Sequence, residues 1–314
     1  MAHSMKPYLS IVVPIFNEEH NIPALHERLK KVLDAQAKEY EIVFVDDGSR
    51  DRSFALLEEL SRKDKALLVL QLSRNFGQHA AVYAGLAKAH GDVIVTLDAD
   101  LQNPPEEIPK LVAKLEEGYD VVGGVRKQRE DSWFRKIPSF VVNRLASKVV
   151  GVKVRDYGCM LRAYRRELVA DMLECQDLST FIPALANSLA RDMAEVEVEH
   201  APRREGRSKY HLFRLLTINF DLLTGFSLLP VQMLSVLGLV TSLAGGGFGV
   251  FLLIRRVFVG PESEGVFTLF AILFGFIGLL FLALGLIGEY IGRIYLEVRH
   301  RPKYTIRKIL GNSR

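Results

Sequence analysis

The chain has 314 residues, of which 49% are hydrophobic and 25% are charged, and its formal net charge at pH 7 is +4. This length leaves room for one sizeable domain and a membrane anchor. The two cysteines, Cys159 and Cys175, have no metal-ligand spacing and form no disulfide framework, which excludes a disulfide-stapled fold. We expect both to be reduced, and we expect no signal peptide at the N-terminus.

Apolar stretches alternate with segments of helical periodicity through the first 125 residues. The predicted strands cover 9–16, 41–47, 66–72, 92–98 and 120–125, and the predicted helices cover 21–37, 51–63, 79–90 and 105–118. This alternation predicts an α/β domain whose mainly parallel sheet has helices on both faces. In such sheets ligands bind beyond the carboxyl ends of the strands.

Two nucleotide-binding fingerprints are missing. The first predicted strand leads into Pro14-Ile15-Phe16-Asn17-Glu18 without a G-x-G-x-x-G pattern, and the chain has no Walker motif. The sequence therefore disfavours a nicotinamide cofactor and a P-loop nucleotide.

The second predicted strand ends in Asp46-Asp47-Gly48-Ser49. Carboxylates at a strand end can accept hydrogen bonds from a base N–H and from ribose hydroxyls. A turn in which Ser49 or Asp51 caps the next helix would use the same residues. The residues alone leave both interpretations open.

The fourth predicted strand ends in Asp98-Ala99-Asp100-Leu101-Gln102. Side chains alternate along a strand, so we expect Asp98, Asp100 and Gln102 to point the same way. Their oxygens suit a hard divalent cation that also carries phosphate. Surface turns also produce D-x-D patterns, but an apolar strand before the motif and Pro104-Pro105-Glu106 after it favour the metal.

Two later segments, 132–150 and 205–230, mix large apolar residues with basic ones. We predict that each lies in the membrane interface as an amphipathic helix. The alternative is an amphipathic helix that packs on the core of the domain.

Residues 231–254 and 266–288 contain no charged residue and no histidine, and each can cross a bilayer as a helix. Basic residues flank them: Arg203, Arg204, Arg207, Lys209 and Arg214 before the first, and Arg293, Arg299, Arg301, Lys303, Arg307, Lys308 and Arg314 after the second. By the positive-inside rule, the expected order is a cytoplasmic domain (1–204), a juxtamembrane helix (205–230), a span (231–254), a periplasmic loop (255–265), a second span (266–288) and a cytoplasmic basic tail (289–314).

Taken together, these motifs carry a family resemblance. Val13-Pro14 with Asn17-Glu18, the Asp46 and Asp98 motifs and Asn75-Phe76-Gly77-Gln78 resemble family 2 glycosyltransferases of the GT-A fold. The Asp-Leu-Gln and Pro-Pro-Glu segments resemble the branch that glycosylates polyprenyl phosphates. Segments around Gly77, Trp133 and Tyr157 are similar to members whose sugar is 4-deoxy-4-formamido-L-arabinose.

The resemblance implies roles for the residues of both motifs. Those expected to bind the UDP-sugar are Pro14, Glu18, Asp46, Asp47 and Asp98. Asp100, assisted by Asp98 and Gln102, is expected to hold Mg²⁺ or Mn²⁺ against the diphosphate. Asp100 and Asp156 are the expected catalytic residues, although Asp156 could instead be a purely structural carboxylate.

Five residues are expected to bind the diphosphate or the lipid phosphate: Arg126, Arg162, Arg204, Ser208 and Lys209. Arginine gives bidentate phosphate contacts and lysine a point charge. The alternative is ordinary attraction of basic residues to anionic lipid.

The implied partners are a UDP-sugar donor, undecaprenyl phosphate as acceptor, and membrane lipids. A homo-oligomer, such as a tetramer, is also implied, and no nucleic-acid partner is expected. One alternative is the same reaction with UDP-glucose or another hexose. A second is a non-catalytic, membrane-anchored nucleotide-sugar binding protein. A processive polysaccharide synthase is disfavoured because the chain has no Gln-x-x-Arg-Trp segment.

Overall fold

A computed structural model describes residues 6–126, 159–175, 182–200, 229–260, 266–298 and 302–311. The chain forms two compact units, one made of residues 1–209 together with 302–314 and the other of residues 210–301. The C-terminal residues therefore return to the unit that contains the N-terminal domain.

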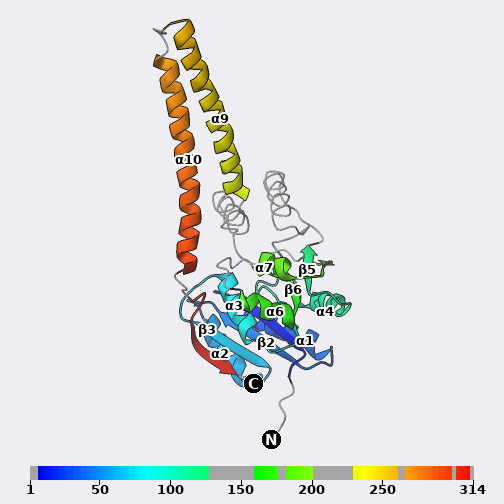
Figure 1. The fold of residues 1–314 in the computed structure, drawn as a ribbon. Coiled ribbons are helices and arrows are strands. Elements are labelled where there is room, and N and C mark those ends of the chain that lie inside the picture. Colours follow the sequence, from blue (N-terminus) through cyan, green and yellow to red (C-terminus); the bar gives the residue numbers. More distant parts are fainter. Residues whose placement is uncertain are drawn as a thin grey trace. The chain divides into compact units, whose positions relative to one another are not determined.

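The described part of the first unit contains an eight-stranded sheet with the order β7-β5-β6-β4-β1-β2-β3-β8 (Figure 1). The strands are β1 (Leu9–Ile15), β2 (Tyr40–Asp46), β3 (Leu67–Leu72), β4 (Val93–Thr96), β5 (Val121–Arg126), β6 (Arg162–Arg165), β7 (Met193–Val198) and β8 (Ile306–Gly311). Strands β1 to β4 run parallel, β7 pairs parallel with β5, and β6 and β8 pair antiparallel with their neighbours. The prediction of a mainly parallel α/β sheet is confirmed.

Helices cover both faces of this sheet. They are α1 (Ile22–Asp34), α2 (Ser53–Lys63), α3 (Gln78–Lys88), the 3-10 turn η1 (Pro105–Glu107), α4 (Ile108–Glu116), α6 (Arg166–Glu174) and α7 (Ile182–Leu189). Apolar side chains of α1, α2 and α4 share one buried cluster, and those of α3, α6 and α7 share another. The unit is therefore a three-layer α/β/α domain.

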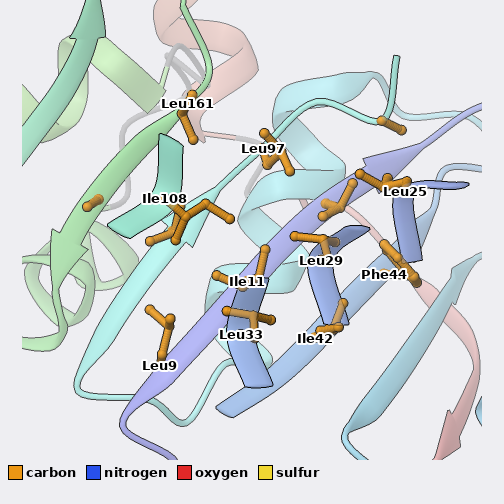
Figure 2. Close-up of a cluster of buried hydrophobic side chains, with 14 of the residues drawn as sticks. Leu9, Ile11, Leu25, Leu29, Leu33, Ile42, Phe44, Leu97, Ile108 and Leu161 are labelled. Atoms are coloured by element: carbon orange, nitrogen blue, oxygen red, sulfur yellow. The ribbon is translucent and has the colours of Figure 1, made fainter. Parts of the chain in front are cut away.

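The packing of α1 shows how the first cluster forms. Leu25, Leu29 and Leu33 are four residues apart, so they lie on one face of the helix. All three are buried against strand residues such as Ile11 and Phe44 (Figure 2). Fully burying each of these leucines contributes about 1.5–3 kcal/mol.

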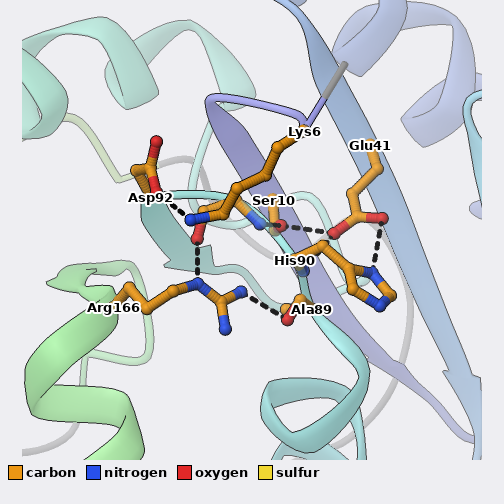
Figure 3. A network of polar contacts seen from close by, with 8 residues as sticks. Lys6, Ser10, Glu41, Ala89, His90, Asp92 and Arg166 are labelled. Atoms are coloured by element: carbon orange, nitrogen blue, oxygen red, sulfur yellow. Dashed lines mark hydrogen bonds and ion pairs between the residues drawn. The ribbon is translucent and has the colours of Figure 1, made fainter. Parts of the chain in front are cut away.

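A polar network lies near the amino ends of β1 and β2, opposite the acidic motifs at their carboxyl ends. The buried carboxylate of Glu41 accepts hydrogen bonds from Ser10 Oγ (2.6 Å) and from the His90 backbone N–H (2.5 Å). Arg166 donates to the carbonyls of Gly91 (2.7 Å) and Ala89 (2.5 Å) (Figure 3). These bonds fix the segment that joins α3 to β4.

The strand β8 lies within residues 289–314, which we predicted to be a basic tail. It pairs antiparallel with β3, and the register shifts between Gln71 and Leu72. Because of this bulge, Ile306 packs on the cluster beneath α3 while Leu310 packs on the cluster beneath α2. Lys308 donates to Glu58 Oε1 on α2 at 2.7 Å.

The second unit contains two long helices, α9 (Leu229–Phe258) and α10 (Val266–Val298). Val231–Phe258 and Gly275–Gly292 are long and apolar enough to cross a membrane, with mean hydropathies of 2.0 and 1.8. Many of their large apolar side chains are exposed, among them Met233, Leu243, Phe281 and Leu282. The helix α10 continues ten residues beyond Gly288, where the uncharged run ends.

Candidate active site

The candidate site lies at the carboxyl ends of β1, β2 and β4. The ladder between β1 and β4 ends at Val12, which pairs with Thr96 and accepts the N–H of Leu97 at 3.0 Å. Pro14 follows on the same side of β1 and has no N–H with which to continue the ladder. The two strands therefore part at Pro14, at the point where the strand order reverses, which is where open α/β sheets bind ligands.

Asp46 ends β2 and is fully buried. Its Oδ1 accepts the Ser49 N–H at 3.2 Å, whereas its Oδ2 has no hydrogen-bond partner within the described residues. Burial raises the pKa of Asp46, and the nearby side chains of Ser49 and Gln71 act in the opposite direction. A buried acceptor without a partner is costly, and a donor N–H from a ligand would satisfy it.

The neighbouring Asp47 has different surroundings. Its Oδ1 accepts the Phe76 N–H at 2.7 Å and its Oδ2 accepts the Gly77 N–H at 2.9 Å. Burial raises its pKa, and these two backbone bonds act in the opposite direction. Asp47 was expected to contact the UDP-sugar, but the structure directs its carboxylate to the loop that follows β3.

The D-x-D motif lies beyond the end of its strand, and not within the strand as we had predicted. Strand β4 ends at Thr96, so Asp98, Asp100 and Gln102 lie in a turn, and the expected strand alternation was wrong. Leu101 adopts a left-handed conformation with φ of 59°. Asp100 Oδ1 accepts the Gln102 N–H at 3.1 Å, which closes the turn.

Charged residues from the same turn and from two other segments act on Asp98. Burial and the like charge of Asp100 raise the pKa of Asp98 to about 7. Arg126, at the end of β5, lowers this pKa, and Glu18 raises it. The structure therefore brings Glu18, Asp100 and Arg126 each within electrostatic range of Asp98.

Gln78 also contacts Asp98, although the sequence pattern predicted no role for it. Its Nε2 donates to Asp98 Oδ1 at 2.6 Å. Its position in the Asn75-Phe76-Gly77-Gln78 segment, directly before an apolar helix, was the signal that could have identified it.

Arg162 lies inside the domain, with 1% of its surface exposed. Its Nε donates to the Cys159 carbonyl at 3.1 Å and its Nη1 to Asn187 Oδ1 at 3.5 Å. This position differs from the phosphate contact that we expected. Asp156, Arg204, Ser208 and Lys209 lie outside the described residues, as does the 132–150 segment.

Metal binding at this site would need ligands from the substrate. Within the described ranges no group of three or more His, Cys, Asp or Glu side chains is placed to hold a metal ion. Two like-charged carboxylates, Asp98 and Asp100, still fit a hard cation, because a positive ion would offset the repulsion that raises the Asp98 pKa. Diphosphate oxygens and water would complete the coordination.

Two comparisons concern the sequence. Residues 10–173 match the sequence profile described as "Glycosyl transferase family 2". The chain is 52% identical over 306 residues to the "Undecaprenyl-phosphate 4-deoxy-4-formamido-L-arabinose transferase" of Proteus mirabilis (strain HI4320), covering 96% of this chain and 94% of the relative.

A third comparison concerns the fold. Glucosyl-3-phosphoglycerate synthase from Mycobacterium tuberculosis, solved in complex with Mn²⁺, uridine diphosphate and phosphoglyceric acid, superposes with a TM-score of 0.52 at 20% sequence identity. The match covers 70% of this chain and 77% of the synthase chain. The three-layer domain therefore has the GT-A-like fold.

Proposed function

The chain belongs to glycosyl transferase family 2, and on that basis we propose that it transfers 4-deoxy-4-formamido-L-arabinose from its UDP-sugar to undecaprenyl phosphate. The observation that carries the proposal is the 52% identity to the Proteus mirabilis transferase, which extends over 96% of the chain and so includes both apolar helices. The product would supply the sugar for lipid A modification and polymyxin resistance.

The nucleotide would occupy the opening where β1 and β4 part. Asp46 Oδ2 is a buried acceptor that a base N–H can satisfy, and Pro14 and Glu18 lie at the neighbouring strand end. A hydrogen bond from the base to a buried carboxylate contributes about 1.5–3 kcal/mol.

The diphosphate would lie beside Asp98, Asp100 and Gln102, the residues that would hold Mg²⁺ or Mn²⁺. Mn²⁺ and uridine diphosphate occur together in the Mycobacterium tuberculosis synthase, whose fold this domain shares. A bound divalent ion supplies Lewis-acid stabilisation of the charge that develops on the leaving diphosphate. Asp100 and Asp98 would hold and orient that ion, and Arg126 would add positive charge on the same side.

The acceptor needs little help from a base. A phosphate monoester has a second pKa of about 6, so its oxygen is already anionic at neutral pH. In-line attack by that oxygen on the anomeric carbon forms the new C–O bond as the bond to UDP breaks, with inversion. Asp156 would orient the acceptor, and Arg204, Ser208 and Lys209 would bind its phosphate.

We further propose that α9 and α10 cross the bacterial inner membrane, with the catalytic unit on the cytoplasmic face. Both helices are long and apolar enough to span. The chain leaves the first unit before residue 210 and returns to it at residue 302, which an even number of crossings explains. Basic residues at 203–214 and 293–314 agree with this orientation.

The test is transfer by the purified full-length protein to undecaprenyl phosphate, with Mg²⁺ or Mn²⁺. Product from UDP-4-deoxy-4-formamido-L-arabinose and none from UDP-glucose would support the proposal. Product from UDP-glucose alone would replace the donor and keep the reaction. UDP binding without product from either sugar would favour a non-catalytic binding protein.

Asp100→Ala provides the site-specific version of this test. We expect the variant to lose at least about 100-fold in turnover, because it would no longer hold the cation whose positive charge stabilises the leaving diphosphate. Its thermal unfolding in detergent should match that of the wild type. Near-normal turnover by Asp100→Ala would contradict the metal assignment.

A further inference from the structure

The loop between β3 and α3 is fixed by the end of β2. Both carboxylate oxygens of Asp47 accept backbone N–H groups of this loop, from Phe76 at 2.7 Å and from Gly77 at 2.9 Å. The Asp47 carbonyl also accepts Asn75 Nδ2 at 3.2 Å. One residue thus holds three consecutive residues of the loop.

The close approach of the two segments requires glycine at position 48. A Cβ on Gly48 would lie 2.7 Å from the carbonyl carbon of Arg74 and 2.7 Å from the nitrogen of Asn75, and its φ is 70°. Gly77, with φ of 98°, then turns the chain into α3. The backbone immediately before Gln78 is therefore fixed by the Asp47 hydrogen bonds and by its close contact with Gly48.

The helix that begins at Gln78 is also held in place. The helix α3 packs against β1 and β2, and a Cβ on Gly85 would lie only 2.3 Å from Val12 Cγ1. From the first position of this helix, Gln78 Nε2 donates to Asp98 Oδ1 at 2.6 Å. The contacts thus run from the end of β2, through the loop after β3, to the carboxylate after β4.

We propose that Asp47 and Gln78 are positioning residues that orient Asp98 for metal and nucleotide binding. Asp47 fixes the loop, the loop fixes the start of α3, and Gln78 engages one oxygen of Asp98 so that the other is directed to the ligand. The proposal rests on the proposed function, because it assumes that Asp98 meets a metal–UDP complex. Partners that orient a metal ligand commonly change metal affinity by about 10–100-fold.

A merely structural role for either residue predicts a different result. If Asp47 only stabilised the loop, its loss would lower the unfolding temperature without a specific effect on the metal. Asp64 offers a matched control, because it is also buried and accepts a backbone N–H, from Ala66 at 3.0 Å, just before the amino end of β3. Lys88 is the matched control for Gln78, because it is exposed at the far end of the same helix.

The experiment measures Mn²⁺ affinity by electron paramagnetic resonance on full-length protein in detergent with saturating UDP. The variants are Gln78→Met, which keeps the side-chain length and removes the donor, and Asp47→Asn, with Lys88→Met and Asp64→Asn as controls. We expect Gln78→Met and Asp47→Asn to raise the Kd for Mn²⁺ by about 10-fold or more. The controls should bind Mn²⁺ as the wild type does, even where Asp64→Asn lowers the unfolding temperature.

Two outcomes would overturn the proposal, and they are distinguishable. Wild-type Mn²⁺ affinity in Gln78→Met would show that the amide does not orient Asp98, while leaving the proposed function intact. UDP binding without Mn²⁺ binding by the wild-type protein would overturn the metal part of the proposed function and this proposal together.

Discussion

At the scale of single residues, His79 shows how the surroundings of the site set a protonation state. It follows Gln78 on α3, and burial lowers its pKa to about 4. The structure keeps this imidazole neutral at physiological pH. The folded protein therefore resists protonation at this position more than the unfolded chain does.

This depressed pKa predicts acid sensitivity of folding. Between pH 6.5, the ordinary histidine value, and about 4, the unfolded chain binds the proton and the folded chain does not, so stability is lost as the pH falls through this window. The unfolding free energy of the wild type should fall between pH 7.5 and pH 5. In His79→Met we expect this fall to be smaller by ~1–2 kcal/mol, because the variant has no histidine at this position to protonate. Thermal unfolding in detergent at the two pH values measures it.

The control for this prediction is His20→Met, because 79% of the His20 side chain is exposed. That variant should keep the pH dependence of the wild type. A His79→Met protein whose unfolding temperature falls with pH as steeply as the wild-type temperature would contradict the prediction.

The acidic motifs could be found in the sequence because each is a short run of neighbouring residues. Their contacts could not be predicted in the same way, because the partners lie far away in the chain. Asp46 and Asp98 could be predicted from their positions after apolar strands. That Asp47 faces a loop 29 residues later, or that Arg162 is buried, depends on tertiary packing, which no local pattern encodes. The turn at Leu101 was missed because an apolar residue normally avoids positive φ.

At the scale of elements, the strands that the sequence missed are those without an apolar run. Strand β6 reads Arg-Ala-Tyr-Arg, and β8 carries Arg307 and Lys308 within six residues. Charged residues are common on edge strands such as β8, because they discourage pairing with another chain, whereas β6 lies inside the sheet between β5 and β4. In β8 the same charges are also typical of a juxtamembrane tail, and Lys308 pairs with Glu58.

The strand β8 should contribute measurably to stability. We expect Ile306→Asp and Leu310→Asp each to lower the unfolding free energy by about 2–4 kcal/mol, because each places a charge against a buried cluster. Chemical unfolding of the full chain in detergent measures this change.

Ile309→Asp, at a position that is 43% exposed on the same strand, should cost less than about 1 kcal/mol. Equal losses in all three variants would show that the strand contributes through its backbone pairing alone.

At the scale of the whole molecule, the shared sheet constrains the topology of the helical unit. Strand β8 and strands β1 to β7 belong to one sheet, so the segments before α9 and after α10 lie on the same side of any membrane that both helices cross. The short connection between the helices then faces the other side.

Cysteine labelling tests this arrangement. In a background without Cys159 and Cys175, we expect Ser263→Cys to react with a membrane-impermeant maleimide on intact spheroplasts. Ser313→Cys should react only after permeabilisation. Labelling of both positions from outside would contradict the hairpin, and labelling of neither would contradict an outward-facing connection.

The place of β8 in the chain also has a consequence for biosynthesis. Translation at about 5–20 residues per second separates the synthesis of β3 from that of β8 by about 10–50 s. During that interval the nascent domain exposes the unpaired edge of β3. If α9 and α10 are the proposed membrane spans, they reach the insertion machinery before β8 is made. Under that proposal the sheet is completed only after the helices have inserted. A chain whose insertion stalls would then present the open edge of β3 to the chaperones and proteases of the cell.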